Sequence, residues 1–546
     1  MPLDALITGR IATLSGDSGF GWVEAVGIRD GRIAFAGSEV DLETRADPFT
    51  ARFRLEPDQV AIPGLTDAHL HLVQAAMASR QVDLSASPTL DDGLARLRTA
   101  HEALPADAWL GGHGWDSDRW GGWPTADQLD AVAPGRRAAI WAHDHHAMWV
   151  SHAALRGADV PDGDPPGGVI RRGADGAPEG VLYEAATRLV TIHVPPMTPD
   201  ALERALIDVS QDLVSLGVVA CHDPGGVAPD PGLTYSYPVY ARLADTGRLP
   251  LRVHVCMRDD AVAAAIEAGY RSGKRLGADP DGRAIVGWQK CFADGSLGSR
   301  TAALLEDIEP EPDHPLPPDR RRGVWMTEPD GLRDRVDRAA AAGIATTIHA
   351  IGDAAVRAAL DVLTPGAAKA PLMPRIEHVQ MLHPDDRPRF AAAGIAASVQ
   401  PVHLGSDAVQ ARRLWGERAE AEGYTWKSIA DTGAVMAFGT DAPVESYDPW
   451  PGLALAVHRE DARWPTGTPP YAPEQALTLD RALRANCIDP AVSAREMDRG
   501  RLTVGQRADV VVIPAAALDE PVTAGGPLST TRPQLVLIDG KVVFEV

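Results

Sequence analysis

The chain has 546 residues, too many for one simple hydrophobic core and enough for a barrel of about 250 residues with attached segments. Hydrophobic residues make up 45% of the chain, as in ordinary soluble proteins, and no apolar run reaches the ~18 residues of a membrane helix. The formal net charge of −23 argues against nucleic acid or an anionic membrane as a partner.

The four cysteines and the first residues of the chain bear on the cellular compartment. The cysteines are scattered, without a C-x-x-C pair, and each lies in an apolar context. This pattern favours reduced thiols over a disulfide framework. Residues 1–16 lack the basic and apolar regions of a signal peptide. We therefore expect a cytoplasmic protein.

Both ends of the chain predict short β-strands. Residues 4–60 alternate between apolar and polar side chains, with a hairpin turn at Asp30-Gly31. The last residues repeat this style, with a turn at Asp539-Gly540. We predict one small composite β-sandwich formed by residues 1–60 and 500–546, with two independent hairpins as the alternative.

The segment AIPGLTDAHLHL, residues 61–72, follows the first set of strands and contains an H-x-H pair. In a strand, residues i and i+2 point to the same face, so His69 and His71 would project side by side. Two such imidazoles can share one divalent cation. The alternative is two unrelated histidines near a strand end, because H-x-H alone is a weak signal.

From residue 73 to about 196 the periodicity is irregular. Residues 89–104 predict an amphipathic helix, and a Gly- and Trp-rich stretch follows at 111–123. This is too much chain for an ordinary loop between a strand and a helix. We predict an insertion at about 75–196 that covers the active site.

From about residue 198, amphipathic helices alternate with short apolar strands. Together with the strand before His69, the predicted strands number eight. Alternation of this kind predicts a parallel sheet, and eight units predict a (β/α)₈ barrel over residues 61–499. Polar residues collect at the C-terminal ends of these strands, where barrel enzymes carry out their chemistry.

Three of these strand ends carry His349, His378 and Asp441, and Lys290 lies in the apolar strand IVGWQKCF. The chain has only five lysines. A buried ammonium is costly, so Lys290 should be neutral or modified, and a neutral amine can form a carbamate with CO₂. The alternative is an ordinary lysine with its ammonium at the barrel mouth.

Several motifs resemble the metal-dependent amidohydrolase superfamily, in its amidohydrolase family 3 branch of YtcJ-like proteins and N-substituted formamide deformylases. They are IPGLTDAHLHL, WQKCFADGSLGSRTA, TIHAIGDAAV, RIEHVQ and FGTDAPVE. The resemblance implies a set of metal ligands, with Lys290 as a bridging carboxylated lysine: His69, His71, Lys290, His349, His378 and Asp441.

The resemblance also implies a reaction. A metal-activated water would cleave a non-peptide C–N amide bond of a small molecule, with Asp441 as the general base. One or two Zn²⁺ ions are expected, with Mn²⁺ or Fe²⁺ left open, and a CO₂-derived carbamate on Lys290. The alternatives are an ester or lactone hydrolase, a deaminase, or a non-catalytic metal-binding regulator.

Other polar and aromatic residues are candidates for contacts with substrate, although each could instead be structural. The candidates are His146, His222, Trp115, Asp116, Gln400 and His403. Trp115 belongs to a group of tryptophans that could line a ligand pocket. The oligomeric state stays open, with a homodimer as the commonest option.

Overall fold

The computed structural model describes residues 3–43, 45, 47–48, 50–143, 147–165, 168–225, 236–310 and 316–546. The chain forms two compact units. The first contains Met1–Leu72 and Ser210–Val546, and the second contains Val73–Val209. Among the described residues, no helix combines the length and apolar character that crossing a membrane requires.

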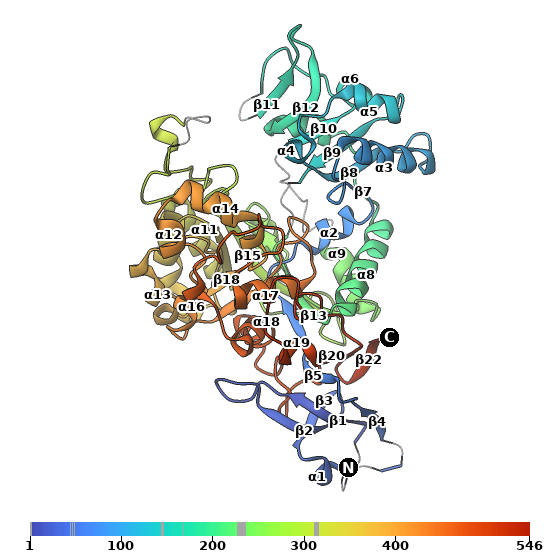
Figure 1. Ribbon diagram of the computed structural model, residues 1–546, viewed down its shortest axis with the longest axis vertical. Coiled ribbons are helices and arrows are strands. Elements are labelled where there is room, and N and C mark those ends of the chain that lie inside the picture. The colour runs from blue at the N-terminus through green and yellow to red at the C-terminus, as the bar shows by residue number, and fades with distance from the viewer. Residues whose placement is uncertain are drawn as a thin grey trace. The chain divides into compact units, whose positions relative to one another are not determined.

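The two ends of the chain meet in one sheet of the first unit, which confirms the composite end domain (Figure 1). Antiparallel pairing of β20 with β5 joins the C-terminal strands to the N-terminal ones. The sheet runs in the order β22(Lys541–Glu545), β21(Leu535–Ile538), β20(Val510–Pro514), β5(Gln59–Pro63), β1(Ala5–Ala12), β2(Trp22–Arg29) and β3(Arg32–Gly37), with β4(Ala51–Arg54) beside β1.

Apolar residues from both ends form the core of this sheet, including Ile7, Val26, Val510 and Leu537. Its turns use the residues that the sequence offers for positive φ. Gly540 has a φ of 73°, and a Cβ added there would lie 2.7 Å from Ile28 Cγ2. Glycine is therefore required at this turn for conformation and for space.

Eight strands of the first unit follow one another in parallel order and confirm the predicted (β/α)₈ barrel. They are β6(Leu65–Asp67), β13(Val218–Asp223), β14(Arg252–Arg258), β15(Ala284–Phe292), β16(Thr346–Ala350), β17(Arg375–His378), β18(Ala396–Val399) and β19(Met436–Phe438). The amide of Ala68 donates to the carbonyl of Phe438 at 2.8 Å, which links the first strand to the last.

Helices alternate with the barrel strands, as the 3.6-residue periodicity predicts. They include α8(Pro199–Ser215), α9(Ser236–Asp245), α11(Pro329–Ala341), α12(Asp353–Leu363), α14(His403–Trp415) and α18(Leu479–Ser493). The buried side of α12 carries Val356, Leu360 and Leu363, spaced so that they share one face. The helical layer therefore buries the outward-facing strand residues.

The second unit is a folded body with its own sheet, which runs in the order β11(Gly168–Arg172), β12(Pro178–Glu184), β10(Ala147–Val150), β9(Ala138–Ala142), β8(Leu110–Trp115) and β7(Val82–Asp83). The predicted helix at 89–104 is α3(Leu90–Ala103), capped by the Thr89 side chain. Leu97, Trp115 and Ile140 belong to its core. The large insertion after the first barrel strand is confirmed, and its position over the active site stays a prediction.

Candidate metal centre

The six predicted ligands come from the C-terminal ends of five different barrel strands. Lys290 lies in β15, His349 lies in β16, and His378 is the last residue of β17. The strand β6 ends at Asp67, so His69 and His71 follow it rather than lie within it. The i and i+2 argument from strand geometry was therefore wrong, although both histidines turn toward the same carboxylate.

That carboxylate belongs to Asp441, which is three residues beyond β19. The carboxylate lies among four imidazoles. Its Oδ1 is 3.2 Å from Nε2 of His69 and 3.2 Å from Nε2 of His71. Its Oδ2 is 3.9 Å from Nδ1 of His378 and 3.5 Å from Nε2 of His403. Two sets of three ligand atoms, each set within 4.8 Å, therefore share Asp441.

The backbone holds Asp441 in this place by bonding the last strand to the first. The Asp441 amide donates to the His69 carbonyl at 2.7 Å, and Asp441 has a positive φ of 60°. A Cβ added at Gly439 would lie 2.5 Å from the His69 amide nitrogen. The carboxylate of Asp67 accepts from the Thr440 hydroxyl at 2.6 Å. The FGTD motif therefore needs its glycine and its threonine for packing against residues 67–69.

Buried ring nitrogens test whether this centre fits a cation. In the part of the chain that the structure describes, Nε2 of His69, Nδ1 of His378 and Nε2 of His403 have no hydrogen-bond partner. Burying an unsatisfied polar atom costs about 1–3 kcal/mol, so such atoms call for an explanation. Imidazole nitrogens together with a carboxylate are common zinc ligands, and the residues present therefore fit a divalent cation.

In three of the predicted histidine ligands, one of the two ring nitrogens is already hydrogen-bonded. Nδ1 of His69 lies 2.6 Å from Oε2 of Glu377, and Nδ1 of His71 lies 2.5 Å from the carbonyl of Gly225. Nε2 of His349 lies 2.9 Å from the carbonyl of Gly295. Each of these oxygens can accept a hydrogen bond from the ring N–H, which leaves the other ring nitrogen free to bind a metal.

Lys290 is 1% exposed, and its Nζ lies 5.1 Å from the centroid of the Phe292 ring. Burial lowers its pKa below the usual value, and the carboxylates of Glu377 and Asp441 only partly oppose this. The shift favours the neutral amine, the form that can react with CO₂.

The acidic and basic groups of the centre influence one another strongly. Burial raises the pKa of Asp441, but His69 and the other imidazoles outweigh it and hold the pKa well below its usual range. Burial, together with Lys290, lowers the pKa of His349 to about 3. Asp441 is therefore a carboxylate and His349 is neutral over the physiological range, as metal ligation requires.

The predicted substrate-binding residues in the first unit occupy different depths. His403 begins α14 and lies at the centre, beside Asp441. Gln400 is 3% exposed, and its Oε1 lacks a partner among the described residues. His222 is fully buried in β13, where its Nδ1 lies 2.6 Å from Nη1 of Arg375.

The remaining candidates belong to the insertion. Trp115 is buried in the second unit and donates to the carbonyl of Ile140 at 2.8 Å. Asp116 is half-buried there and accepts from the amide of Arg119 at 3.2 Å. His146 lies outside the described residues. The substrate contacts of all three stay predictions.

Sequence reasoning missed Glu377, which is the buried partner of His69, and the two residues that hold Glu377, which are Arg375 and Thr347. Glu377 is fully buried and accepts from the Thr347 hydroxyl and from Nε of Arg375, the latter at 2.9 Å. The signal was present in the motif RIEH, where two charged residues occupy a short strand that must be buried on both faces.

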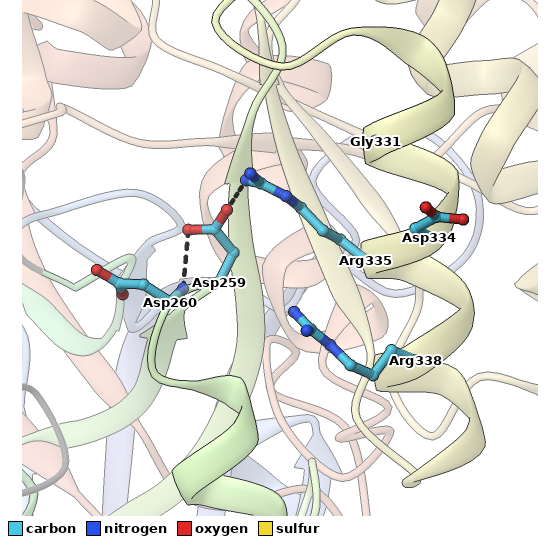
Figure 2. Close-up of a pocket in the computed structure, with 6 residues that line it drawn as sticks. All are labelled: Asp259, Asp260, Gly331, Asp334, Arg335 and Arg338. Carbon is cyan, nitrogen blue, oxygen red and sulfur yellow. Dashed lines mark hydrogen bonds and ion pairs between the residues drawn. The ribbon is translucent and has the colours of Figure 1, made fainter.

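A separate cavity of about 360 Å³ lies outside the ligand cluster, beyond the end of β14 and beside α11 (Figure 2). Its lining residues are Asp259, Asp260, Gly331, Asp334, Arg335 and Arg338. Arg335 pairs with Asp259, whose Oδ1 also accepts from the Asp260 amide at 3.0 Å. Neither set of candidate ligand atoms includes a residue of this cavity.

Comparison with known proteins identifies the family. Residues 58–544 match the sequence model of the amidohydrolase family. The chain belongs to this family. As an amidohydrolase it is a metal-dependent hydrolase, and the match covers the barrel together with most of the composite end domain.

Curated relatives of this amidohydrolase align over nearly its whole length. The protein LONG AFTER FAR-RED 3 of Arabidopsis thaliana is 30% identical over 530 residues, covering 95% of this chain and 88% of the relative. YtcJ of Bacillus subtilis (strain 168) is 30% identical over 541 residues and 96% of both chains. The N-substituted formamide deformylase of Arthrobacter pascens is 27% identical over 542 residues, covering 96% and 95%. The family 3 branch is thereby confirmed.

Solved structures share the fold of this amidohydrolase. An uncharacterized metal-dependent hydrolase from Pyrococcus furiosus has a TM-score of 0.73 and 23% identity, covering 93% of this chain and 98% of its own. Atrazine chlorohydrolase from Arthrobacter aurescens TC1, solved in complex with zinc, has a TM-score of 0.52 and 15% identity, covering 99% and 95%. These similarities support the barrel assignment.

Proposed function

We propose that this amidohydrolase cleaves the C–N bond of a small amide in the cytoplasm, with Asp441 as the general base. The observation that carries the proposal is the position of the Asp441 carboxylate, whose two oxygens face two different sets of imidazoles. A carboxylate in this place can accept a proton from a water held at the barrel mouth.

The residues that would hold metal fall into two groups around Asp441. His69 and His71 approach one oxygen, while His378 approaches the other, with His349 packed against the His378 ring at a centroid distance of 4.4 Å. Lys290, as a carbamate, would supply two further oxygens. The metal we propose is zinc. When bound, it would lower the pKa of a water molecule and polarise the substrate carbonyl.

Asp441 moves the proton in the reaction. Its carboxylate accepts a proton from water while the water oxygen forms a bond to the carbonyl carbon. The protonated carboxyl then gives this proton to the nitrogen as the C–N bond breaks. The products are a carboxylic acid and an amine, so atoms and charges balance. We assign His403, whose Nε2 lies 3.5 Å from Oδ2, to the substrate oxygen rather than to the metal, so that its N–H would donate to that oxygen in the same step.

The amide class is favoured over esters by the relatives rather than by the geometry alone. The Arthrobacter pascens relative is an N-substituted formamide deformylase, aligned over 96% of this chain. Its name describes hydrolysis of a non-peptide C–N bond, and we extend that class of bond to this amidohydrolase.

A substrate panel tests the proposal directly. Full-length protein loaded with Zn²⁺ is assayed against N-formyl, N-acyl, carbamate and ester compounds, with a chelator-treated sample beside it. We expect amine release from one of the amide classes, lost on chelation and restored by Zn²⁺. Hydrolysis of esters alone, or activity that resists chelation, would contradict the proposal.

A further inference from the structure

The guanidinium of Arg375 bonds to three strands of the barrel that are not all neighbours. It is 1% exposed, and its Nη2 donates to Oε1 of Glu377 at 2.6 Å and to the carbonyl of Ala68 at 2.8 Å. Its Nη1 lies 2.6 Å from Nδ1 of His222. Arg375 therefore joins β17, β13 and the residue after β6 through the barrel interior.

The two carboxylate oxygens of Glu377 have different partners. One bonds to the residues that hold Glu377, and the other bonds to the candidate ligand His69. Oε1 accepts from Arg375 and from the Thr347 hydroxyl, which fixes the carboxylate on its own side of the barrel. Oε2 lies 2.6 Å from Nδ1 of His69, across the interior. Both carboxylate oxygens are thus used within a region from which water is excluded, since Glu377 and His69 are fully buried.

We propose that Arg375 and Glu377 are positioning residues that set the tautomer and the direction of His69. The inference rests on the proposed metal-dependent function. When Nδ1–H donates to Glu377, the neutral His69 ring carries its lone pair on Nε2, the atom that faces Asp441. Arg375 also bonds the carbonyl of Ala68, so one guanidinium orients both the backbone entering His69 and the carboxylate that holds its ring.

His69 differs in this respect from the other two ligands whose second nitrogen is bonded. His71 and His349 are held by backbone carbonyl oxygens, of Gly225 and Gly295. A carboxylate is the stronger acceptor, and it makes the opposite nitrogen a better electron donor to a metal. His69 is therefore the ligand on which metal retention depends most.

Stability alone is a weak reason for these buried charges. A buried ion pair loses much of its Coulombic gain to desolvation, and well-packed apolar residues are often as stabilising. The geometry instead serves orientation, because one guanidinium contacts Glu377 in β17, His222 in β13 and Ala68 after β6. The role should therefore be visible in metal binding and not only in unfolding.

The test compares Glu377→Gln with the wild type in the full-length protein. Affinity for Zn²⁺ is measured by chelator competition, Co²⁺ absorption reports coordination geometry, and urea unfolding reports stability. We expect Zn²⁺ affinity to fall by about 10–100-fold and the Co²⁺ spectrum to change. The glutamine keeps the volume of the side chain but cannot serve Arg375 and His69 as a carboxylate does.

Asp509→Asn provides the matched control, because it weakens the ion pair of another fully buried arginine. This arginine is Arg252, whose carboxylate partners are Asp509 and Asp539. It should lower stability and leave Zn²⁺ affinity and the Co²⁺ spectrum unchanged. Should Glu377→Gln fail to fold, Thr347→Val decides, since it removes only a hydroxyl donor to Glu377 and should weaken Zn²⁺ binding several-fold.

Two failures are distinguishable. A wild-type protein that binds no Zn²⁺ or Co²⁺ would remove the proposed function itself. A wild-type protein that binds Zn²⁺, with Glu377→Gln or the fallback Thr347→Val binding it equally well and showing the same Co²⁺ spectrum, would overturn only the positioning role.

Discussion

Two buried arginines serve two regions of this amidohydrolase in different ways. Arg375, inside the barrel, bonds one carboxylate, one carbonyl and one imidazole. Arg252, at the start of β14, bonds the carboxylates of Asp509 and Asp539 from the composite end sheet. A buried guanidinium thus contacts the groups around His69 in one region and joins the barrel to the end sheet in the other.

The acidic partners confirm the contrast. Asp509 directly precedes β20, and Asp539 lies in the turn after β21, so Arg252 links the barrel to the C-terminal strands. Burial lowers the pKa of Arg252, and the two aspartates outweigh it and raise the pKa above its usual value. Arg252 is therefore a charged tie between layers, far in sequence from the metal ligands.

The largest expected effect is at the barrel mouth. Asp441→Asn removes the proposed base while keeping the size of the side chain, so kcat should fall by about 10²–10⁴-fold. Steady-state kinetics and metal analysis on the same preparation measure it. Metal content should stay near that of the wild type. A mutant with full turnover would remove Asp441 as the base.

The next effect belongs to the other region. Asp509→Asn leaves Arg252 with one carboxylate, and breaking a buried pair typically costs about 3–5 kcal/mol. Urea unfolding should show a lower free energy of unfolding. The loss should be smaller than for a fully unpaired arginine, because Asp539 still bonds Arg252. Normal stability in this variant, or a loss of Zn²⁺ affinity, would remove the distinction between the two arginines.

A smaller effect is expected at His403. Replacing it with phenylalanine keeps a ring at the start of α14 but removes the Nε2 that faces Asp441. Loss of one hydrogen bond to a developing charge should lower kcat/KM by about tenfold. Measured kcat/KM on the best amide of the panel decides it. Unchanged kcat/KM would assign His403 a structural role only.

The smallest effect concerns a turn of the end sheet. Gly540→Ala forces a side chain into a positive-φ position and toward Ile28, so stability should fall by about 1–2 kcal/mol. The midpoint of urea unfolding measures it, with Zn²⁺ affinity as the control. A stability equal to wild type would show that the turn relaxes at no cost.

The sequence predicted the barrel well because its signals are local and repeated. Apolar strands such as ATTIH alternate with amphipathic helices, and polar residues lie near the C-terminal ends of several strands. Asp539-Gly540 and Asp30-Gly31 are turn signals with a direct physical cause. The candidate ligands could be proposed from the sequence because histidine, lysine and aspartate recur at one end of these strands, and their metal binding stays a prediction.

Other features depend on contacts between residues distant in sequence, which periodicity does not report. The bond between Glu377 and His69 joins strands six and one of the barrel, and its two residues are separated by 308 positions. The strand that was expected to carry His69 ends two residues earlier, at Asp67. The Asp67 side chain accepts a hydrogen bond from the His69 amide at 3.0 Å, in place of a strand partner. Only the folded chain brings these groups together.

The most direct test of the account is a zinc-edge anomalous difference map from crystals of the zinc-loaded protein. We expect density between the imidazoles of His69 and His71 and the carboxylate of Asp441, with any second peak next to His378. Zinc-loaded crystals with no peak beside Asp441, or with the ion bound elsewhere on the chain, would contradict the assignment of this cluster as the metal centre.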